Sequence, residues 1–257
     1  MTAPLVGVID EAGATWRRLR LDAPPGHILS LALVHALTAA LNEAAARPGL
    51  KWLTIEGSQG QFSYGASIPE HLPGPMAEVL PAMHELMRLV LDFPAPTAAL
   101  VAGRCLGGGF ELALCCDAII ATSDATLGVP EIKLAAFPPV AAALLPMRVG
   151  ASRASRAVLT GEALPAAYWR EAGLLSLVPE AVTLFEAAFS WFARYLAPRP
   201  AVTLRHAARA TRAVWRPQVE RALAENERRY LDELLASPDA EEGVRAWMEK
   251  RPPRWRE

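Results

Sequence analysis

The chain has 257 residues, of which 52% are hydrophobic and 21% are charged, and its formal net charge at pH 7 is −1. This length and composition describe an ordinary globular protein with one large core rather than a disordered chain. The near-zero charge and the lack of a long basic block argue against a nucleic acid or an anionic membrane as partner. The short Arg-rich stretch at residues 250–256 is interpreted either as a solvated tail or as a local phosphate contact.

Cysteines, apolar runs and histidines restrict the location and the chemistry. Cys105, Cys115 and Cys116 lie in one apolar region, which predicts reduced core thiols in a cytoplasmic protein. No signal-peptide leader opens the sequence, and no run of about 18 apolar residues predicts a membrane span. The five histidines lack metal-binding spacing, so surface or structural roles are expected for them and no metal site is predicted.

The first half of the chain is predicted to alternate between strands and helices. Apolar runs at residues 5–9 and 15–21 flank a turn at residues 10–13, which is typical of a hairpin. Ser30 then caps a helix that ends near Arg47. Further strands are predicted at residues 51–55, 97–102 and 118–121, and further helices at 76–91 and 108–116. This alternation favours a sequentially wound α/β layer over a sandwich or a barrel.

After residue 151 the pattern predicts helices alone. Prolines separate segments near residues 151–159, 165–172, 181–196, 199–213, 217–234 and 239–250. We therefore expect an α/β core over residues 1–195 and a C-terminal helical region over residues 196–257. The helical region is expected to pack on the core or on a neighbouring subunit.

A cluster of glycines lies between a predicted strand and a predicted helix. Gly107, Gly108 and Gly109 expose backbone N–H groups at a helix N-terminus, where negative charge is favoured. The cluster is neither a Walker loop nor a dinucleotide-binding fingerprint, because the required spacings are absent. A glycine run alone serves packing or a turn more often than a site.

Two glutamates strengthen the functional interpretation of this cluster. Glu111 falls in the first turn of the helix that follows the glycines, and Glu131 lies twenty positions further on, in a mostly apolar loop. Alone, Glu111 could simply stabilise the helix dipole. Two carboxylates beside an anion-binding glycine turn can instead form an acid/base pair.

The sequence resembles the crotonase (enoyl-CoA hydratase/isomerase) superfamily over nearly its whole length. Residues 103–117 are similar to the signature helix of that superfamily, residues 128–134 to its second glutamate loop and residues 62–67 to its Phe-Cys-x-Gly-Ala-Asp segment. The resemblance implies an α/β fold of ββα-type units in a spiral core, followed by a helical trimerisation region. Other matching segments are residues 21–29, 160–174 and 246–251.

The same resemblance implies the site residues. It places an oxyanion hole on the backbone N–H groups of Ala66 and Gly108, and it matches Glu111 and Glu131 to both glutamates of the hydratase pattern. Glu111 suits the base, because a helix N-terminus favours its anion, and Glu131, among apolar neighbours, suits the neutral acid. The implied substrate-binding residues are Ile28, Leu29, Gly65, Ser67, Ile68, Gly107, Phe137, Pro138, Trp247 and Lys250.

Two departures from the superfamily pattern bear on the substrate. Ser67 stands where the family usually has Asp, which puts the role of that side chain in doubt. Phe137-Pro138-Pro139 replaces a glycine-rich stretch and is expected to form a rigid wall that favours a flat or cyclic acyl group over a long straight chain. In this stretch and in residues 62–73 the chain resembles the cyclohexa-1,5-diene-1-carbonyl-CoA hydratases of anaerobic aromatic degradation.

The predicted activity is thus hydration of an enoyl- or cyclic dienoyl-CoA thioester, without a metal or redox cofactor. The resemblance implies a homotrimer or a dimer of trimers. An isomerase, decarboxylase or ring hydrolase of the same superfamily is the first alternative. A non-catalytic or RNA-binding relative is the second, and it should lack a glutamate or carry a basic stripe, neither of which the sequence shows.

Overall fold

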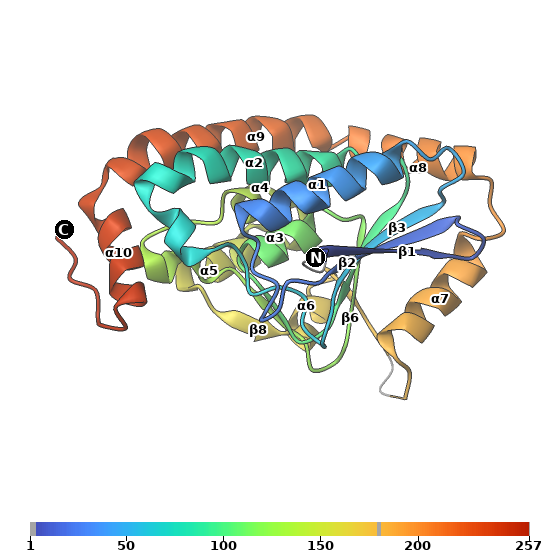
Figure 1. The fold of residues 1–257 in the computed structure, drawn as a ribbon, viewed down its shortest axis with the longest axis horizontal. Coiled ribbons are helices and arrows are strands. Elements are labelled where there is room, and N and C mark those ends of the chain that lie inside the picture. Colours follow the sequence, from blue (N-terminus) through green and yellow to red (C-terminus); the bar gives the residue numbers. More distant parts are fainter. Residues whose placement is uncertain (1–3, 179–180, 257) are drawn as a thin grey trace.

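The computed structural model describes residues 4–178 and 181–256 (Figure 1). Its main layer is a six-stranded sheet in the order β1-β2-β3-β4-β6-β9. The first two strands pair antiparallel, as the predicted hairpin requires, and the later pairings are parallel. The predicted sequential winding is therefore confirmed. The strands are β1 (Val6–Glu11), β2 (Trp16–Leu21), β3 (Trp52–Gly57), β4 (Thr97–Val101), β6 (Ala118–Ala121) and β9 (Ser176–Leu177).

The central strands are continuous hydrophobic runs because both of their faces are covered. All residues of β4 are buried, and so are the first five of β3. In the parallel register Leu19 lies opposite Ile55, which lies opposite Ala99. Parallel strands buried on both faces do not show the two-residue alternation of a strand with one solvated face.

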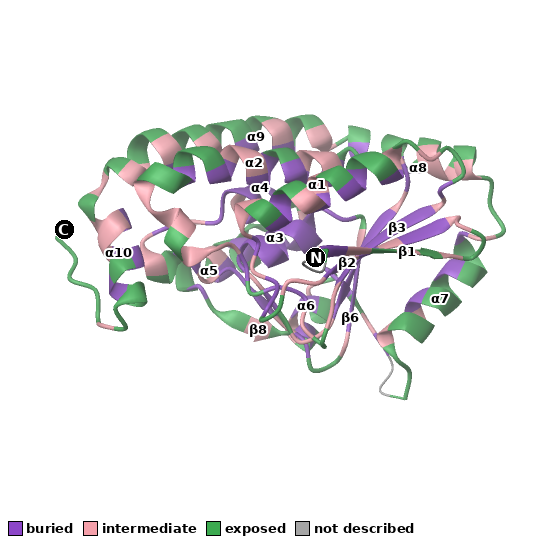
Figure 2. Ribbon diagram, in the orientation of Figure 1, coloured by how far each residue is buried: buried purple, intermediate pink, exposed green. Residues whose placement is uncertain are grey.

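Three helices lie side by side along one edge of the molecule as drawn in Figure 1: α1 (Leu31–Ala45), α2 (Pro73–Leu91) and α9 (Arg216–Arg228). Ser30 caps α1 as predicted, since its hydroxyl oxygen accepts a hydrogen bond from the N–H of Leu33 at 3.4 Å. Figure 2 shows buried residues gathered on the inner sides of α1 and α2, whereas much of α9 is exposed. The apolar sides of α1 and α2 thus close the core.

A smaller sheet carries the glycine cluster. Its strands β5 (Arg104–Leu106), β7 (Thr126–Gly128) and β8 (Ala163–Pro165) follow the order β5-β7-β8. Gly107 leads from β5 into the short helix α3 (Gly108–Leu114), whose residues are all buried. Two 3₁₀ turns, η1 (Ile68–His71) and η2 (Pro130–Leu134), complete this region. The segments that the sequence singled out therefore meet at one end of a small sheet.

The second half is mostly helical, with three differences from the prediction. The strands β8 and β9 interrupt the expected run of helices, because segments of three and two residues are too short to show a period. Pro139 begins a helix where a rigid loop was expected, since proline at the first helical position loses no needed N–H. The division at residues 195 and 196 stays a prediction. The helical elements are α4 (Pro139–Val149), α5 (Ala151–Thr160), α6 (Ala166–Glu171), α7 (Leu184–Tyr195), α8 (Ala201–Ala213), the π-helical η3 (Arg229–Glu233), the 3₁₀ turn η4 (Leu234–Ala236) and α10 (Pro238–Met248).

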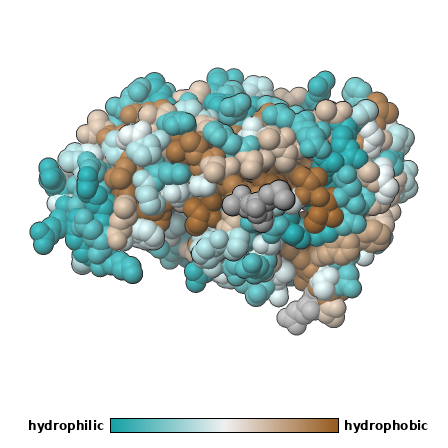
Figure 3. Space-filling view, in the orientation of Figure 1, coloured by the Kyte–Doolittle hydropathy of each residue, from teal (hydrophilic) through white to brown (hydrophobic). Residues whose placement is uncertain are grey.

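The three cysteines, Cys105, Cys115 and Cys116, are free and buried, as predicted. Over residues 4–178 and 181–256, no helix has the length and apolar character needed to cross a membrane. On the face drawn in Figure 3, hydrophilic residues cover the end that carries α10, and hydrophobic residues gather near the middle.

A buried arginine ties α8 to the main sheet. The guanidinium of Arg212 donates to both carboxylate oxygens of Asp117, at 2.8 and 2.5 Å, and to the carbonyl oxygens of Phe93 and Ala95. Asp117 also accepts a hydrogen bond from the N–H of Thr97 at 2.8 Å. One ion pair thus joins α8 to the start of β4.

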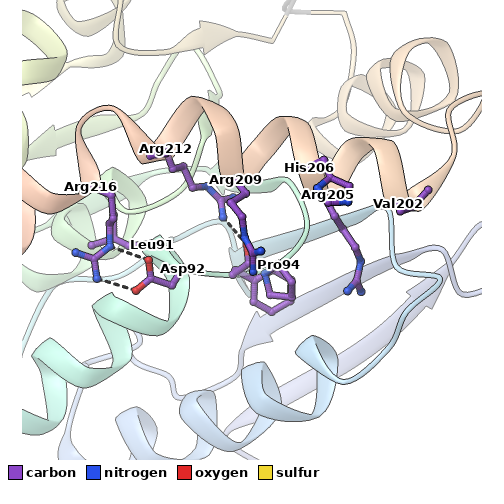
Figure 4. A pocket seen from close by; sticks show the side chains of 11 residues that line it. Leu91, Asp92, Pro94, Val202, Arg205, His206, Arg209, Arg212 and Arg216 are labelled. Atoms are coloured by element: carbon purple, nitrogen blue, oxygen red, sulfur yellow. Dashed lines mark hydrogen bonds and ion pairs between the residues drawn. The ribbon is translucent and has the colours of Figure 1, made fainter.

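Arg212 borders a surface hollow of about 520 Å³ that is rich in arginines (Figure 4). Several of these cations are engaged in the fold. Arg216 pairs with Asp92 at 2.7 Å, and Arg205 donates to the carbonyl oxygen of Arg47. The hollow therefore contains a structural ion network, and the acid/base pair expected from the sequence lies elsewhere.

The Arg212 contacts predict a large loss of stability on truncation. Changing Arg212→Met would remove the cation that pairs with Asp117 and the donor to two carbonyl groups. The free energy of unfolding should therefore fall by about 2 to 3 kcal/mol, somewhat less than for a wholly buried pair. Urea denaturation measures this change. The exposed Arg209 on the same helix is the matched control, and Arg209→Met should change stability by about 0.5 kcal/mol or less. Equal effects of the two substitutions would contradict the anchoring role.

Candidate active site

A small cavity under α2 contains both predicted glutamates. Its volume is about 40 Å³, and its lining is mostly apolar. Glu111 is 6% exposed and Glu131 is 9% exposed. The cavity is lined by Ala66, His71, Met76, Val79, Leu80, Met83, His84, Met87, Gly108, Glu111, Glu131, Phe137, Pro139, Val140 and Tyr230. Residues from α2, α3 and α4, from the turns η1, η2 and η3 and from two loops thus converge on the carboxylate pair.

Glu111 is held by the N-terminus of a second helix. Its Oε1 accepts hydrogen bonds from the N–H groups of Val140 at 2.8 Å and Ala141 at 2.9 Å, in the first turn of α4. Burial raises the pKa of Glu111, while these N–H groups and the nearby His84 lower it in part. The first turn of a helix has N–H groups without intrahelical acceptors, so α4 supplies donors that favour the Glu111 anion.

Glu131 has a different environment. It lies in η2, and its Oε2 atom is buried without a hydrogen-bond partner among the described residues. Burial, and secondarily the charge of Glu111, raise the pKa of Glu131 well above its usual range. The neutral, proton-carrying form of Glu131 is therefore favoured.

The turn at Gly107 allows Glu131 to lie close to the start of α3. Gly107 has φ +52°, a backbone conformation that residues other than glycine rarely adopt. A Cβ atom at this position would lie 2.6 Å from Oε1 of Glu131, which is too close for any real contact. Only glycine at residue 107 therefore leaves room for Glu131 in this position.

Two backbone N–H groups near the glutamates could bind an anion. The N–H of Gly108 lies in the first turn of α3, and an added Cβ on Gly108 would be 3.5 Å from the nitrogen of Ala66. Within the described ranges neither N–H donates to a protein acceptor. The loop that carries Ala66 is fixed by a hydrogen bond from the N–H of Leu29 to the carbonyl oxygen of Gly65 at 2.9 Å. The two donors are thus close together and free.

The structure gathers some of the expected substrate-binding residues and separates others. Leu29, Gly65 and Gly107 surround the two free N–H groups, and Phe137 lines the cavity against Tyr230, with ring centroids 5.3 Å apart. Pro138 is buried as the N-cap of α4, whereas its neighbour Pro139 lines the cavity.

The other expected residues lie outside the cavity. Ile28 precedes Leu29 in a partly buried loop, and Ser67 begins η1, where its carbonyl oxygen lies 2.9 Å from Nδ1 of His71. Ile68 and Trp247 border a separate hollow of about 250 Å³, next to η2 and α10. Lys250 is exposed beyond the end of α10. The structure does not test these roles in binding.

Several cavity residues were missed by reasoning from the sequence. His84 is 1% exposed and lies in the cavity, although a surface or structural role was expected for each histidine. Tyr230 enters the cavity from η3, and wide π-helical turns are frequent at functional sites. Met76, Met83 and Met87 contribute flexible walls. No local motif marks any of them, but the positions of His84 and the methionines on the apolar side of α2 are visible in the periodicity.

Two free amides beside a buried carboxylate pair are groups that can stabilise an oxyanion and transfer protons. The chain belongs to the enoyl-CoA hydratase/isomerase family, whose family model matches residues 6–257. It is 39% identical over 248 residues to the cyclohexa-1,5-dienecarbonyl-CoA hydratase of Thauera aromatica, covering 95% of this chain and 94% of that protein. It is 34% identical to the 2,3-dehydroadipyl-CoA hydratase of Escherichia coli, with 91% and 92% covered.

Solved structures confirm the expected crotonase-type fold. The enoyl-CoA hydratase of Mycobacterium avium subsp. paratuberculosis superposes with a TM-score of 0.85 at 28% identity, covering 98% of this chain and 99% of that one. An enoyl-CoA hydratase/isomerase of Xanthobacter autotrophicus gives a TM-score of 0.84 at 27% identity, covering 98% and 100%.

Because Oε2 of Glu131 is buried without a partner among the described residues, we expect the free energy of unfolding to depend on pH. Its pKa is raised in the folded state, so the folded protein keeps a proton that the unfolded chain releases above about pH 4.5, and stability falls as the pH rises through that range. Changing Glu131→Gln should therefore raise the free energy of unfolding by about 1 kcal/mol or more at pH 8, and by about zero at pH 4. Chemical denaturation at both pH values measures the difference.

Glu111→Gln is the matched control for this measurement. Glu111 already has two backbone donors, so its neutralisation should stabilise the protein less at pH 8 than that of Glu131. A gain for Glu131→Gln that is the same at both pH values would contradict the assigned protonation.

Proposed function

We propose that this protein is an acyl-CoA hydratase that adds water to an enoyl- or cyclic dienoyl-CoA thioester. The observation that carries the proposal is the contrast between the two buried carboxylates: Glu111 has two N–H donors, and Glu131 has an Oε2 without any partner among the described residues. Carboxyl groups whose environments separate their pKa values suit a base and an acid. The two free N–H groups beside them suit a thioester oxygen.

The proposed reaction uses each of these groups once. The thioester oxygen accepts hydrogen bonds from the N–H groups of Ala66 and Gly108. Glu111 takes a proton from water as the water oxygen bonds to the β-carbon, and the electron pair of the double bond moves toward the thioester to give an enolate. Protonated Glu131 then gives its proton to the α-carbon. One water is consumed, and proton exchange between the carboxyl groups through solvent restores the starting state.

The acyl group is proposed to be compact and ring-shaped. The cavity of about 40 Å³ is bounded by Phe137 and Tyr230, and burial of the rigid Pro139 fixes the adjoining wall. The relative from Thauera aromatica is named for a cyclic dienoyl thioester, and the one from Escherichia coli for a linear one. The higher identity to the former supports the cyclic substrate. Flexible methionines on α2 would move when the acyl group enters.

The remaining features of the proposal concern cofactor, assembly and location. The reaction needs no metal or redox group, because backbone donors and two carboxyls perform every step. Among the described residues no cluster of metal-ligating side chains is found. We further propose a homotrimer or a dimer of trimers in the cytoplasm, a location with which the three free cysteines agree.

Product analysis combined with the two glutamate variants tests the activity. The purified enzyme should convert cyclohexa-1,5-diene-1-carbonyl-CoA or crotonyl-CoA to a product heavier by one water, detected by mass spectrometry. Glu111→Gln and Glu131→Gln should each lower kcat about 100-fold or more with little change in KM, because each removes a proton-transfer group. A shifted double bond, loss of carbon dioxide or an opened ring would instead identify another activity of the family. Near wild-type turnover in both variants would refute the two-glutamate mechanism.

The aromatic wall predicts a preference for cyclic acyl groups. Wild-type enzyme should favour the cyclic dienoyl thioester over a linear six-carbon enoyl thioester by roughly 10- to 200-fold in kcat/KM, the range expected when an apolar pocket excludes a poorly fitting group. Phe137→Leu should reduce this ratio toward one by opening the wall. Phe189→Leu, which changes an exposed aromatic residue on α7, should leave the ratio unchanged. Equal wild-type rates for both thioesters would overturn the cyclic assignment and leave the hydratase assignment in place.

A further inference from the structure

A histidine faces the same cavity as the two glutamates and takes no part in the reaction described above. His84 lies on α2, is 1% exposed and lines the cavity together with Glu111 and Glu131. Its Nδ1 atom forms a short contact with Oε2 of Glu227, which belongs to α9. Its Nε2 atom is buried and has no partner within the described part of the chain. One side of the imidazole is therefore fixed, and the other is available.

An available Nε2 atom in this position indicates a ligand. Buried polar atoms in folded proteins are nearly always hydrogen-bonded to protein or to water. The cavity, at about 40 Å³, has room for about one to three water molecules and is too small for a ring-shaped acyl group without movement of its walls. Oε2 of Glu131 is a second buried atom without a partner among the described residues. Two residues that line one small cavity thus each have a buried polar atom without a partner among the described residues, and a bound water could satisfy both atoms.

We propose that His84 is a third catalytic group, whose Nε2 atom holds the water molecule that is added to the acyl group while Glu227 orients the imidazole. This inference rests on the proposed hydratase function. His84 neither gains nor loses a proton in the reaction. Glu111 still receives the proton of the water, and Glu131 still supplies the proton that reaches the α-carbon. The histidine contributes a fixed hydrogen bond to the water oxygen or to its second hydrogen, and so orients the water toward the β-carbon.

A purely structural role for His84 explains less of the geometry. The helices α2 and α9 are already joined by Arg88, whose Nε lies 2.9 Å from Oε1 of Glu220. Arg88 also approaches Glu227, with its Nη2 atom 3.8 Å from Oε2. An anchor needs only the Nδ1 contact, and it gives no reason for a buried nitrogen of a cavity residue to have no partner among the described residues. The unpartnered Nε2 atom therefore favours a contact with the water over a purely structural link between the helices.

Two substitutions at the same residue separate these roles. The amide of His84→Asn can replace Nδ1 and keep the contact with Glu227, but it cannot reach the place of Nε2. The longer His84→Gln places its amide near Nε2 and gives up the contact with Glu227. Glu85→Gln, at the exposed neighbour on the same helix, is the control. Each variant is assayed for kcat and KM in hydration of the best thioester of the wild-type enzyme, and for Tm.

If His84 holds the water, His84→Asn should lose about 10- to 100-fold in kcat with KM nearly unchanged, while His84→Gln keeps kcat within about fivefold and Glu85→Gln keeps wild-type values. The inference is overturned if His84→Asn keeps wild-type kcat. A rise in KM alone would also overturn it, because the contact would then be made to a non-reacting part of the acyl group. So would equal losses in both variants together with a lowered Tm, which would identify a helix anchor. A wild-type enzyme that hydrates no thioester would instead refute the proposed function itself, and this inference with it.

Discussion

The burial of two carboxylates in one apolar cavity is the constraint on which the arrangement of this protein depends. Two negative charges side by side, away from water, are strongly unfavourable, so one of the pair must be neutral or both must be compensated. The fold compensates only Glu111, through the N–H groups of Val140 and Ala141. Among the described residues Glu131 receives no such support at Oε2, so burial favours its protonated form. The difference between the two carboxyl groups thus follows from where one helix begins.

Several local features serve this asymmetry. The proline pair before Val140 starts α4 at the residue that brings its first N–H groups to Glu111. The positive φ of Gly107 turns the chain so that Glu131 can lie against it. Asn226 on α9 donates from Nδ2 to the carbonyl oxygen of Pro139 at 2.8 Å and holds the start of α4 in place. Residues 137–139 therefore shape the cavity wall and also set the helix N-terminus that binds Glu111.

The sequence predicted the order of the sheet well because its central strands are buried on both faces and its helices have clear apolar stripes. Short elements escaped prediction for the opposite reason. β9 has two residues and is defined by its partner β6, so its own sequence contains almost no signal. Pro138 and Pro139 resemble a loop unless the position of the following helix is known. Tertiary context decides both cases.

The residues of the candidate site also differ in how far they can be predicted from the sequence. Ala66, Gly108, Glu111 and Glu131 could be singled out because each lies in a short segment that resembles a superfamily motif, and the structure brings all four to one cavity. His84 and Glu227 were not found as a pair, because they are 143 positions apart and meet only when α9 packs against α2. Tyr230 owes its place to a π-helical turn that no short pattern reveals. Contacts between distant helices are the part of an active site that a single sequence hides best.

The contribution of α9 has a consequence for how the enzyme becomes active as it is made. The ribosome completes the strands, the glycine turn and both glutamates long before it reaches Asn226 and Glu227 on α9 and Tyr230 on η3. A chain without these residues lacks Tyr230 in the cavity wall and the hydrogen bond from Asn226 to the start of α4. A nascent chain therefore contains both glutamates before the residues that complete their surroundings, and the whole cavity can form only near the end of synthesis.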